Sequence, residues 1–427
     1  MIATLVRTVG HRIKYGVKAR STLYYSSSSI VCQGLRFLGI LISTAAIAPD
    51  QFGRYATAMM LVGLCGLAKE FGQNPAFLSC TRTEPAYARF HFLLSLALSL
   101  IVVLLLFISI TLIPGFSNLR TALPLLCLTV LIEGATMTAL LVAQKRFEFR
   151  RMAIIEIAAT ASWLLCVASG SRFYPVAMTL IFARLMESLV RGVSLLGWLY
   201  RDFIQGKITL EVAGYYGRFA RLLTPQGWIE NLLGNVDVLL LNSFSTQTDL
   251  GVYDRTNQLV RIPLSTSINL VDRVAAAAYS RDQESISVLQ RSILQFATLV
   301  VLGTIAGLVA VQLFVWFLAG PLLGTSWKNA VSSLWIWAIP YCLFRPLVWN
   351  FNLVFLSTSR PKHLLFTLLG ILLTLSIGGL ILTPTLGSRG VFAAFGFSYF
   401  IMLAAQTLWF IRSIHKTRQC EQRILVP

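Results

Sequence analysis

Residues 214–274 read GYYGRFARLLTPQGWIENLLGNVDVLLLNSFSTQTDLGVYDRTNQLVRIPLSTSINLVDRV. Two long apolar segments flank a short polar turn, which predicts a pair of helices. Charged residues nevertheless lie within the segments, at Arg221, Glu230, Asp237, Asp254 and Arg261. In a membrane helix each such charge costs about 2.5–3.5 kcal/mol, so these side chains are expected to face protein or water. They are the first candidates for function.

The composition of the chain is that of a membrane protein. Of its 427 residues, 56% are hydrophobic and only 12% are charged, whereas soluble domains carry about 25% charged residues. The net charge of +19 would suggest a nucleic-acid partner in a soluble chain. In a membrane protein, Lys and Arg held in cytoplasmic loops explain it more simply. No nucleic-acid partner is therefore expected.

Apolar runs long enough to cross the bilayer recur along the whole chain. A helix needs about 20 residues to span the hydrocarbon layer. Runs of this kind lie at 22–47, 54–78, 90–113, 120–143, 151–169, 174–199, 217–244, 250–272, 290–319, 328–357, 363–383 and 389–411. The sequence predicts an all-α polytopic membrane protein with about 12 transmembrane helices.

The distribution of Lys and Arg orients these spans. With a cytoplasmic N-terminus, 24 of the 36 cations fall on the cytoplasmic side and six on the other. Those six are Arg54, Arg120, Arg172, Arg255, Lys328 and Arg389. This asymmetry predicts that both termini are cytoplasmic.

Two turns suggest that the chain is a doubled unit. A shift of 198 positions places Gly53 on Gly251 and Tyr55 on Tyr253, each just after the first span of a half. Internal repeats are typical of transporters, although chance similarity of two apolar hairpins is the alternative. We predict an N-terminal six-helix bundle at 1–206, with a basic N-terminal tail, and a C-terminal six-helix bundle at 207–427. The tail, residues 1–20, is expected to form an interfacial basic helix or to be disordered.

The sequence offers little for catalysis or metal binding. The seven cysteines lie mostly in apolar runs without CxxC spacing, and no HExxH motif is present. The connections between spans are short, so none could fold as a separate catalytic domain. We expect a transporter without enzymatic chemistry and without a cofactor.

Charges inside the predicted spans form a balanced set. The cations are Arg36, Lys69, Arg184, Arg191, Arg261 and Arg345, and the acids are Glu70, Glu133, Glu156, Glu187, Glu230 and Asp237. Such charges must pair, reach the interface or line a wet cavity. Arg184, Glu187 and Arg191 share one helical stripe. A polar interior shared by both halves is one interpretation, and simple ion pairing between neighbours is the other.

Several motifs resemble those of one family. They are RFLGILISTAAIAPDQFGRYATA, the step KEFG, NLLGNVDVLLLNSFSTQTDLGVYDRTNQLVRIP and LLGTSWKNAVSSLWIWAIPYCLFRPL. The chain resembles polysaccharide and O-antigen flippases of the Wzx type, in the multidrug/oligosaccharidyl-lipid/polysaccharide (MOP) exporter superfamily. Where that family usually has aspartate-glycine, this chain has Glu70-Phe71-Gly72.

The resemblance implies a V-shaped pair of six-helix bundles in a bacterial inner membrane. It implies alternating access that moves a polyprenyl-diphosphate-linked oligosaccharide from the cytoplasmic to the periplasmic leaflet. The cargo would be a repeat unit of O-antigen, capsule or exopolysaccharide. Membrane lipids and polysaccharide assembly proteins are the expected partners of a monomeric transport unit.

Roles for the intramembrane charges follow from this cargo. Because a diphosphate is anionic, the predicted substrate-binding residues are Arg36, Arg184, Arg191, Arg261 and Arg345. The predicted ion-coupling residues are Glu70, Glu230 and Asp237, with a proton or sodium gradient as the candidate driving force. The rivals are a drug/cation antiporter, a lipid II flippase and a membrane-embedded polymerase.

Overall fold

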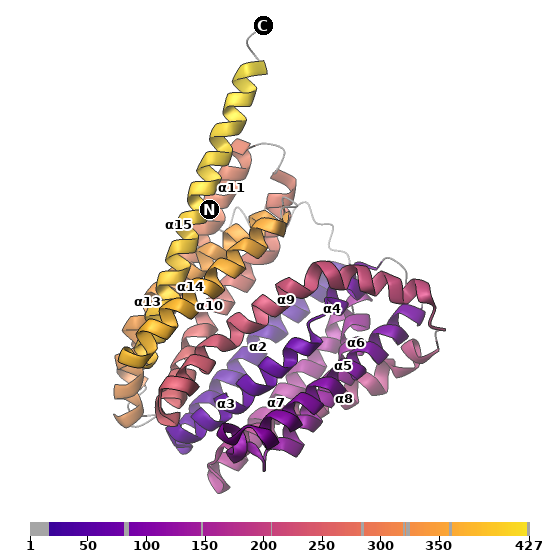
Figure 1. Cartoon of the computed structure of the whole chain (residues 1–427), viewed down its shortest axis with the longest axis vertical. Coiled ribbons are helices and arrows are strands. Elements are labelled where there is room, and N and C mark those ends of the chain that lie inside the picture. The colour runs from indigo at the N-terminus through magenta and orange to yellow at the C-terminus, as the bar shows by residue number, and fades with distance from the viewer. Residues whose placement is uncertain are drawn as a thin grey trace. The chain divides into compact units, whose positions relative to one another are not determined.

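The computed structural model describes residues 17–80, 85–146, 148–205, 207–282, 286–318, 321, 325–357 and 361–424. Within these ranges the regular structure is helical (Figure 1), which confirms the predicted all-α class. Among the described residues, eight helices are long and apolar enough to cross a membrane. The count of about 12 spans and the cytoplasmic termini stay predictions. Residues 1–16 of the predicted basic tail lie outside the described residues.

Packing divides the chain into two units, which we call unit 1 and unit 2. Unit 1 contains 1–46 and 61–228, and unit 2 contains 47–60 and 229–427. The predicted division at residue 206 follows chain order and stays a prediction. The two packing units do not follow chain order, because α3 (Pro49–Cys65) and α9 (Leu210–Phe244) each contribute residues to both of them.

Unit 1 is a bundle in which α5, α6 and α8 pack together and α2 packs on α7. Its helices are α2 (Val17–Ala46), α4 (Gln73–Ser79), α5 (Pro85–Leu112), α6 (Leu123–Lys145), α7 (Phe149–Phe173) and α8 (Ala177–Ile204), with the short 3-10 helices η1 (Gly66–Lys69) and η2 (Pro114–Leu119). The first part of α9 joins this unit through its tyrosines. Tyr215 donates a hydrogen bond to the carbonyl of Ala76 and Tyr216 to that of Tyr87, both at 3.1 Å.

The predicted span 54–78 is not one continuous helix. The α-helix α3 ends at Cys65, η1 follows, and α4 begins at Gln73. The break lies at the KEFG step, where Gly72 has φ 64°. A side chain is strained in this left-handed conformation, which explains why a glycine stands there. The break places Lys69 and Glu70 at an irregular turn inside unit 1.

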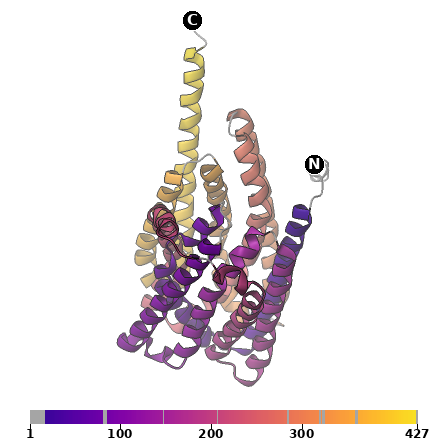
Figure 2. The same ribbon diagram turned by 90° about the vertical axis from the view of Figure 1, so that its right-hand side faces the viewer.

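Unit 2 is built around α10 and α13, which pack against each other and against α11. Its helices are α10 (Gln247–Asp282), α11 (Ile286–Leu313), α13 (Thr325–Ser357), α14 (Pro361–Leu386) and α15 (Ser388–Ile424), and a π-helical turn, η3 (Phe314–Leu318), follows α11. The second part of α9 contributes Val236, Leu240 and Leu241 to the core. The helix α15, which is the yellow ribbon that leads to the label C in Figure 2, runs to Ile424 and so past the predicted end of the last span at residue 411.

The starts of α3 and α10 meet in a reciprocal contact inside unit 2. A Cβ on Gly53 would lie 1.9 Å from the carbonyl oxygen of Gln247, and one on Gly251 would lie 1.8 Å from that of Pro49. Only glycine permits backbones to approach this closely. The shift of 198 that relates Gly53 to Gly251 also relates Pro49 to Gln247. The two contacts are therefore equivalents of each other, as a doubled unit requires.

Arg255, one of the six cations predicted to lie on the non-cytoplasmic side, is buried at this junction. Arg255 is 3% exposed. Its guanidinium lies 4.0 Å from the ring centroid of Phe52 and donates to Asp254 at 3.0 Å. A cation held over an aromatic face is stabilised by the ring quadrupole. Arg255 therefore packs α10 onto α3.

Candidate functional site

Glu187 is the centre of an ion-pair cluster in unit 1. This side chain is 2% exposed. It accepts hydrogen bonds from Arg36 of α2 at 2.6 Å, from Arg184 at 3.1 Å and from Arg191 at 2.9 Å. The spacing of three and four residues along α8 places Arg184 and Arg191 on the face that carries Glu187. One buried carboxylate thus binds three guanidinium groups.

Two further carboxylates complete the pairing. Arg184 donates to Glu133 of α6 at 2.9 Å, and Ser188 donates to the same carboxylate at 3.2 Å. Arg191 makes a bidentate contact with Glu156 of α7 at 2.9 and 3.0 Å. Bidentate pairs are the strong form of this interaction. The three predicted substrate-binding arginines of unit 1 are therefore held by carboxylates.

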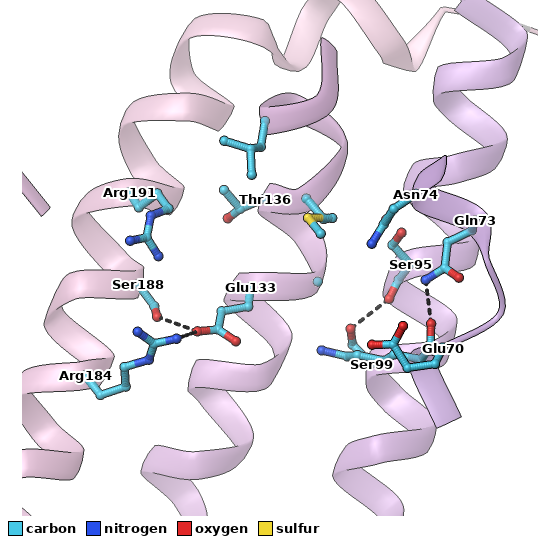
Figure 3. Close-up of a pocket in the computed structure, with 14 residues that line it drawn as sticks. Glu70, Gln73, Asn74, Ser95, Ser99, Glu133, Thr136, Arg184, Ser188 and Arg191 are labelled. Atoms are coloured by element: carbon cyan, nitrogen blue, oxygen red, sulfur yellow. Dashed lines mark hydrogen bonds and ion pairs between the residues drawn. The ribbon is translucent and has the colours of Figure 1, made fainter. Parts of the chain in front are cut away.

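A cavity of about 320 Å³ opens beside this cluster (Figure 3). Its charged lining residues are Lys69, Glu70, Glu133, Arg184 and Arg191, and its uncharged polar ones are Gln73, Asn74, Ser95, Ser99, Thr136 and Ser188. Met137 and Leu140 add apolar surface. In Figure 3 the α8 side chains face those of α6, while Glu70, Gln73, Asn74, Ser95 and Ser99 form the opposite wall. We call this cavity the unit 1 pocket.

The opposite wall is fixed by its own hydrogen bonds. Gln73 donates to the carbonyl of Lys69 at 2.7 Å and Ser99 to that of Ser95 at 2.7 Å. Behind it the fully buried His91 lies 2.8 Å from the hydroxyl of Thr138 and 3.1 Å from the amide oxygen of Asn74. These hydrogen bonds hold the side chains of the wall in place.

A second polar cluster lies in unit 2 around Asp237, which is 1% exposed. Its carboxylate accepts a hydrogen bond from the hydroxyl of Tyr253 at 2.7 Å and one from the amide of Asn257 at 3.5 Å. Its other oxygen accepts from the backbone N–H of Val238 at 2.9 Å. Among the described residues no cation lies within 4.0 Å of this carboxylate, so neutral donors satisfy it.

The two predicted substrate-binding arginines of unit 2, Arg261 and Arg345, interact mainly with tyrosine. Arg345 donates to the hydroxyl of Tyr341, and its guanidinium lies 5.4 Å from the ring centroid of that residue. Arg261 interacts electrostatically with Tyr341 and Asp237, and its buried Nε has no hydrogen-bond partner among the described residues. Asp237 interacts electrostatically with Arg261, so one aspartate balances only part of the positive charge of the two arginines.

The predicted site residues therefore fall into two groups. Arg36, Arg184 and Arg191 join the ion-pair cluster, and Glu70 lines the unit 1 pocket. Arg261, Arg345 and Asp237 belong to the unit 2 cluster, which lies in the other unit. Glu230 is exposed on α9 and does not line the pocket. Whether these residues bind substrate or couple an ion stays a prediction.

Sequence reasoning identified Asn257 as a candidate polar group but missed several other neutral residues of the two clusters. Tyr253 and Tyr341 look like ordinary aromatic residues of apolar spans, and no spacing rule pairs them with Asp237 or Arg345. Gln73 and Asn74 lie within a predicted span, yet the break at Gly72 carries them to the pocket wall. The described residues contain no group of His, Cys, Asp and Glu that could hold a metal ion.

Comparison with known proteins gives one family and one fold. Residues 46–332 match the family described as polysaccharide biosynthesis protein. Over 264 residues the chain is 23% identical to the lipopolysaccharide biosynthesis protein WzxC of Escherichia coli (strain K12), covering 60% of this chain and 53% of that protein. The chain thus matches about half the length of this relative.

Solved transporters share the architecture. The lipid II flippase MurJ in an inward closed conformation has a TM-score of 0.71 at 13% identity, with 92% of this chain and 87% of that chain covered. An inward-facing multidrug resistance MATE family transporter of the MOP superfamily has a TM-score of 0.68 at 13% identity, with 91% and 96% covered. Together with the family match and the similarity to WzxC, this shared fold confirms the resemblance that the motifs predicted. At such identities the structures establish the fold alone.

Proposed function

The chain belongs to the polysaccharide biosynthesis protein family, and from that premise we propose that it is a flippase for a polyprenyl-diphosphate-linked oligosaccharide. The cargo is a repeat unit of O-antigen, capsule or exopolysaccharide. It moves from the cytoplasmic to the periplasmic leaflet of a bacterial inner membrane by alternating access, and the protein makes or breaks no covalent bond. Both termini lie in the cytoplasm, and one chain is the transport unit.

The unit 2 cluster carries this proposal. Each guanidinium offers five N–H donors, and the partners described for Arg345 and Arg261 are mainly tyrosine. Asp237 is satisfied by Tyr253, Asn257 and Val238. Donors on the two arginines therefore remain for an anion. A diphosphate fits because arginine binds phosphate oxygens through paired, charge-assisted hydrogen bonds.

Binding of a prenyl diphosphate without sugar to the purified full-length protein tests this proposal. We expect Arg261→Gln and Arg345→Gln each to weaken binding by about tenfold or more, which corresponds to about 1.4 kcal/mol. The matched control is Arg389→Gln, because Arg389 is an exposed arginine at the start of α15. If both variants bound the lipid as tightly as the control, the unit 2 cluster would not be the diphosphate site.

Ion coupling forms a second part of the proposal. Glu70, Glu230 and Asp237 are the carboxylates we assign to a coupling proton or sodium ion. Transport in proteoliposomes should then respond to a pH or sodium gradient and lose that response in at least one of Glu70→Gln, Glu230→Gln and Asp237→Asn. Transport that ignored both gradients would remove coupling from the mechanism.

A drug antiporter and a lipid II flippase are the rivals within the same fold. An antiporter of cationic drugs needs uncompensated acidic groups, whereas the arginines in the unit 2 cluster outnumber its one aspartate. Ethidium efflux from cells that express the protein would favour the antiporter. Rescue of a strain that lacks its peptidoglycan-precursor flippase would favour lipid II.

A further inference from the structure

An apolar groove of about 420 Å³ lies on the opposite side of α6 from the unit 1 pocket. Its lining consists of leucine, isoleucine, valine, alanine and glycine from α5, α6 and α8, and it includes Leu100, Ala135 and Val193. On α6 the lining residues Ile132 and Ala135 alternate with the pocket residues 133, 134 and 136. Helical periodicity therefore points the two sets to opposite faces. We call this recess the α6 groove.

The α6 groove lies midway along its three helices. Its lining residues fall at 96–100 of α5, 131–135 of α6 and 189–196 of α8, all within predicted membrane spans. It opens outward between its walls, where Leu100 is 54% and Val193 is 70% exposed. At this depth the surroundings are hydrocarbon. An empty recess would forfeit dispersion contacts there, and a lipid chain restores them by filling it.

One end of the same helices is strongly basic. A cluster that contains Tyr87, Val142 and Leu199 joins the start of α5 to the ends of α6 and α8. The segments at this end, 85–89, 145–151 and 197–207, carry seven cations and two acids. Those at the other end, 112–123 and 171–178, carry two cations and no acid. The basic end is the one predicted to face the cytoplasm, and such an excess of cations attracts anionic lipid headgroups.

Helical spacing connects the basic end with the α6 groove. Arg89 precedes Leu96 by seven residues, and Arg146 follows Ala135 by eleven. Both intervals are close to whole turns, so each arginine lies on the groove side of its helix. Eleven residues rise about 16 Å, and one lipid chain covers about 15 Å, half of the hydrocarbon layer. A lipid whose headgroup lies at the basic end therefore reaches the groove with the end of one chain.

We propose that the α6 groove and the basic end of unit 1 together bind one membrane phospholipid with an anionic headgroup. One acyl chain fills the groove, and the headgroup phosphate lies among the cations. Every element of this site belongs to unit 1. The site goes beyond the proposed function, because the phospholipid is a bound partner and not the transported substrate.

Photocrosslinking of the full-length protein in bilayers tests this site. The probes are phosphatidylglycerol and phosphatidylcholine with the same diazirine near the end of one acyl chain, and mass spectrometry locates the label. We expect phosphatidylglycerol to label Leu100 and Val193 about fivefold more than phosphatidylcholine does, because each nearby cation favours an anionic headgroup by about that factor. Leu165 of α7, which is 69% exposed, is the control position and should be labelled equally by both probes.

Two sets of variants separate the chain from the headgroup. Ala135→Phe fills the groove from its floor and should lower the labelling of Leu100 and Val193 about fivefold with both probes. Ala158→Phe is the matched control, because Ala158 is exposed on α7, and it should change nothing. Arg146→Gln should reduce the preference for phosphatidylglycerol to about twofold. Arg146→Lys keeps the charge and should keep the preference.

Several outcomes would overturn the phospholipid site. Arg120→Gln lies at the opposite end of α5 and α6 and should leave the preference unchanged, so a loss equal to that of Arg146→Gln counts against the site. So does equal labelling of the groove by both probes, or an equal effect of Ala135→Phe and Ala158→Phe in folded protein. Stronger labelling by a prenyl diphosphate with the same diazirine would assign the groove to the tail of the cargo instead. If Ala135→Phe does not fold, Ala135→Leu should still lower the labelling about twofold.

Discussion

Arginines lie inside the helices of both units, and the two units neutralise them differently. In unit 1 the guanidinium groups of Arg36, Arg184 and Arg191 all contact Glu187, and two of them reach a second glutamate. In unit 2 Arg345 contacts Tyr341, and the buried Asp237 is bonded to neutral donors. A carboxylate cancels a charge, whereas a phenol orients a guanidinium and leaves its charge in place. The first arrangement stabilises a bundle, and the second fits the anion site that we propose.

The largest expected effect is that of Glu187→Gln. Removing one partner of a buried ion pair costs about 3–5 kcal/mol, and this carboxylate serves three arginines at 2.6–3.1 Å. We expect a large drop in melting temperature and in the yield of folded protein. Glu148→Gln is the control, since Glu148 meets the exposed Arg151 only at 3.9 Å and such pairs contribute about 0–1 kcal/mol. Similar melting temperatures for both variants would contradict a structural role for the unit 1 cluster.

Asp237→Asn should lower the stability less than Glu187→Gln does, because the acid of unit 2 is bonded to neutral donors. The change keeps one oxygen as acceptor, and the Tyr253 hydroxyl can reverse its role and accept from the new amide. We expect a loss of about 1–3 kcal/mol, the cost of an imperfect buried hydrogen bond. Equilibrium binding of the bare prenyl diphosphate should be retained or tightened, because the positive charge of the cluster rises. Weaker binding of that lipid would show that Asp237 supports the arginines as Glu187 does.

Tyr341→Phe should have the smallest effect on stability. It removes the hydroxyl that accepts from Arg345 but keeps the ring beneath the guanidinium. We expect a loss of about 1 kcal/mol and a severalfold weaker affinity for the bare prenyl diphosphate. Melting curves and lipid titrations measure the two quantities separately. Unchanged lipid affinity would mean that Tyr341 does not orient Arg345.

The fold class followed from the sequence because hydropathy is summed over some 20 residues and tolerates local errors. The pairing of Arg184 with Glu187 was also open to prediction, since helical spacing fixes it. The pairing of Arg191 with Glu156 depends on how α7 packs on α8, which spacing within one helix cannot give. The predicted run 54–78 is not one helix, because α3 ends at Cys65 and Gly72 takes a positive φ angle, and hydropathy carries no signal for either break.

The aromatic residues beside the two clusters could not be identified from the sequence. A tyrosine in a membrane span has the same appearance whether it fills the core or holds an arginine. Trp228 was likewise part of an apolar stretch, and only its hydrogen bond to Leu67 and the place of Gly227 put it beside the unit 1 pocket. A charged residue within an apolar span is conspicuous because burying its charge costs free energy. A neutral residue that binds a ligand costs little and cannot be told from a packing residue in the sequence.

The reciprocal contact of Gly53 and Gly251 has a consequence for the origin of the chain. Each glycine meets the first-turn carbonyl of the opposite helix, Gln247 or Pro49, and one shift relates both contacts. In an oligomer this would be an isologous interface, in which the same patch is used twice. A half-length ancestor that formed a symmetric homodimer would already have contained it. Fusion of two gene copies would then keep the interface and release each half to diverge, one toward carboxylate pairing and the other toward tyrosine.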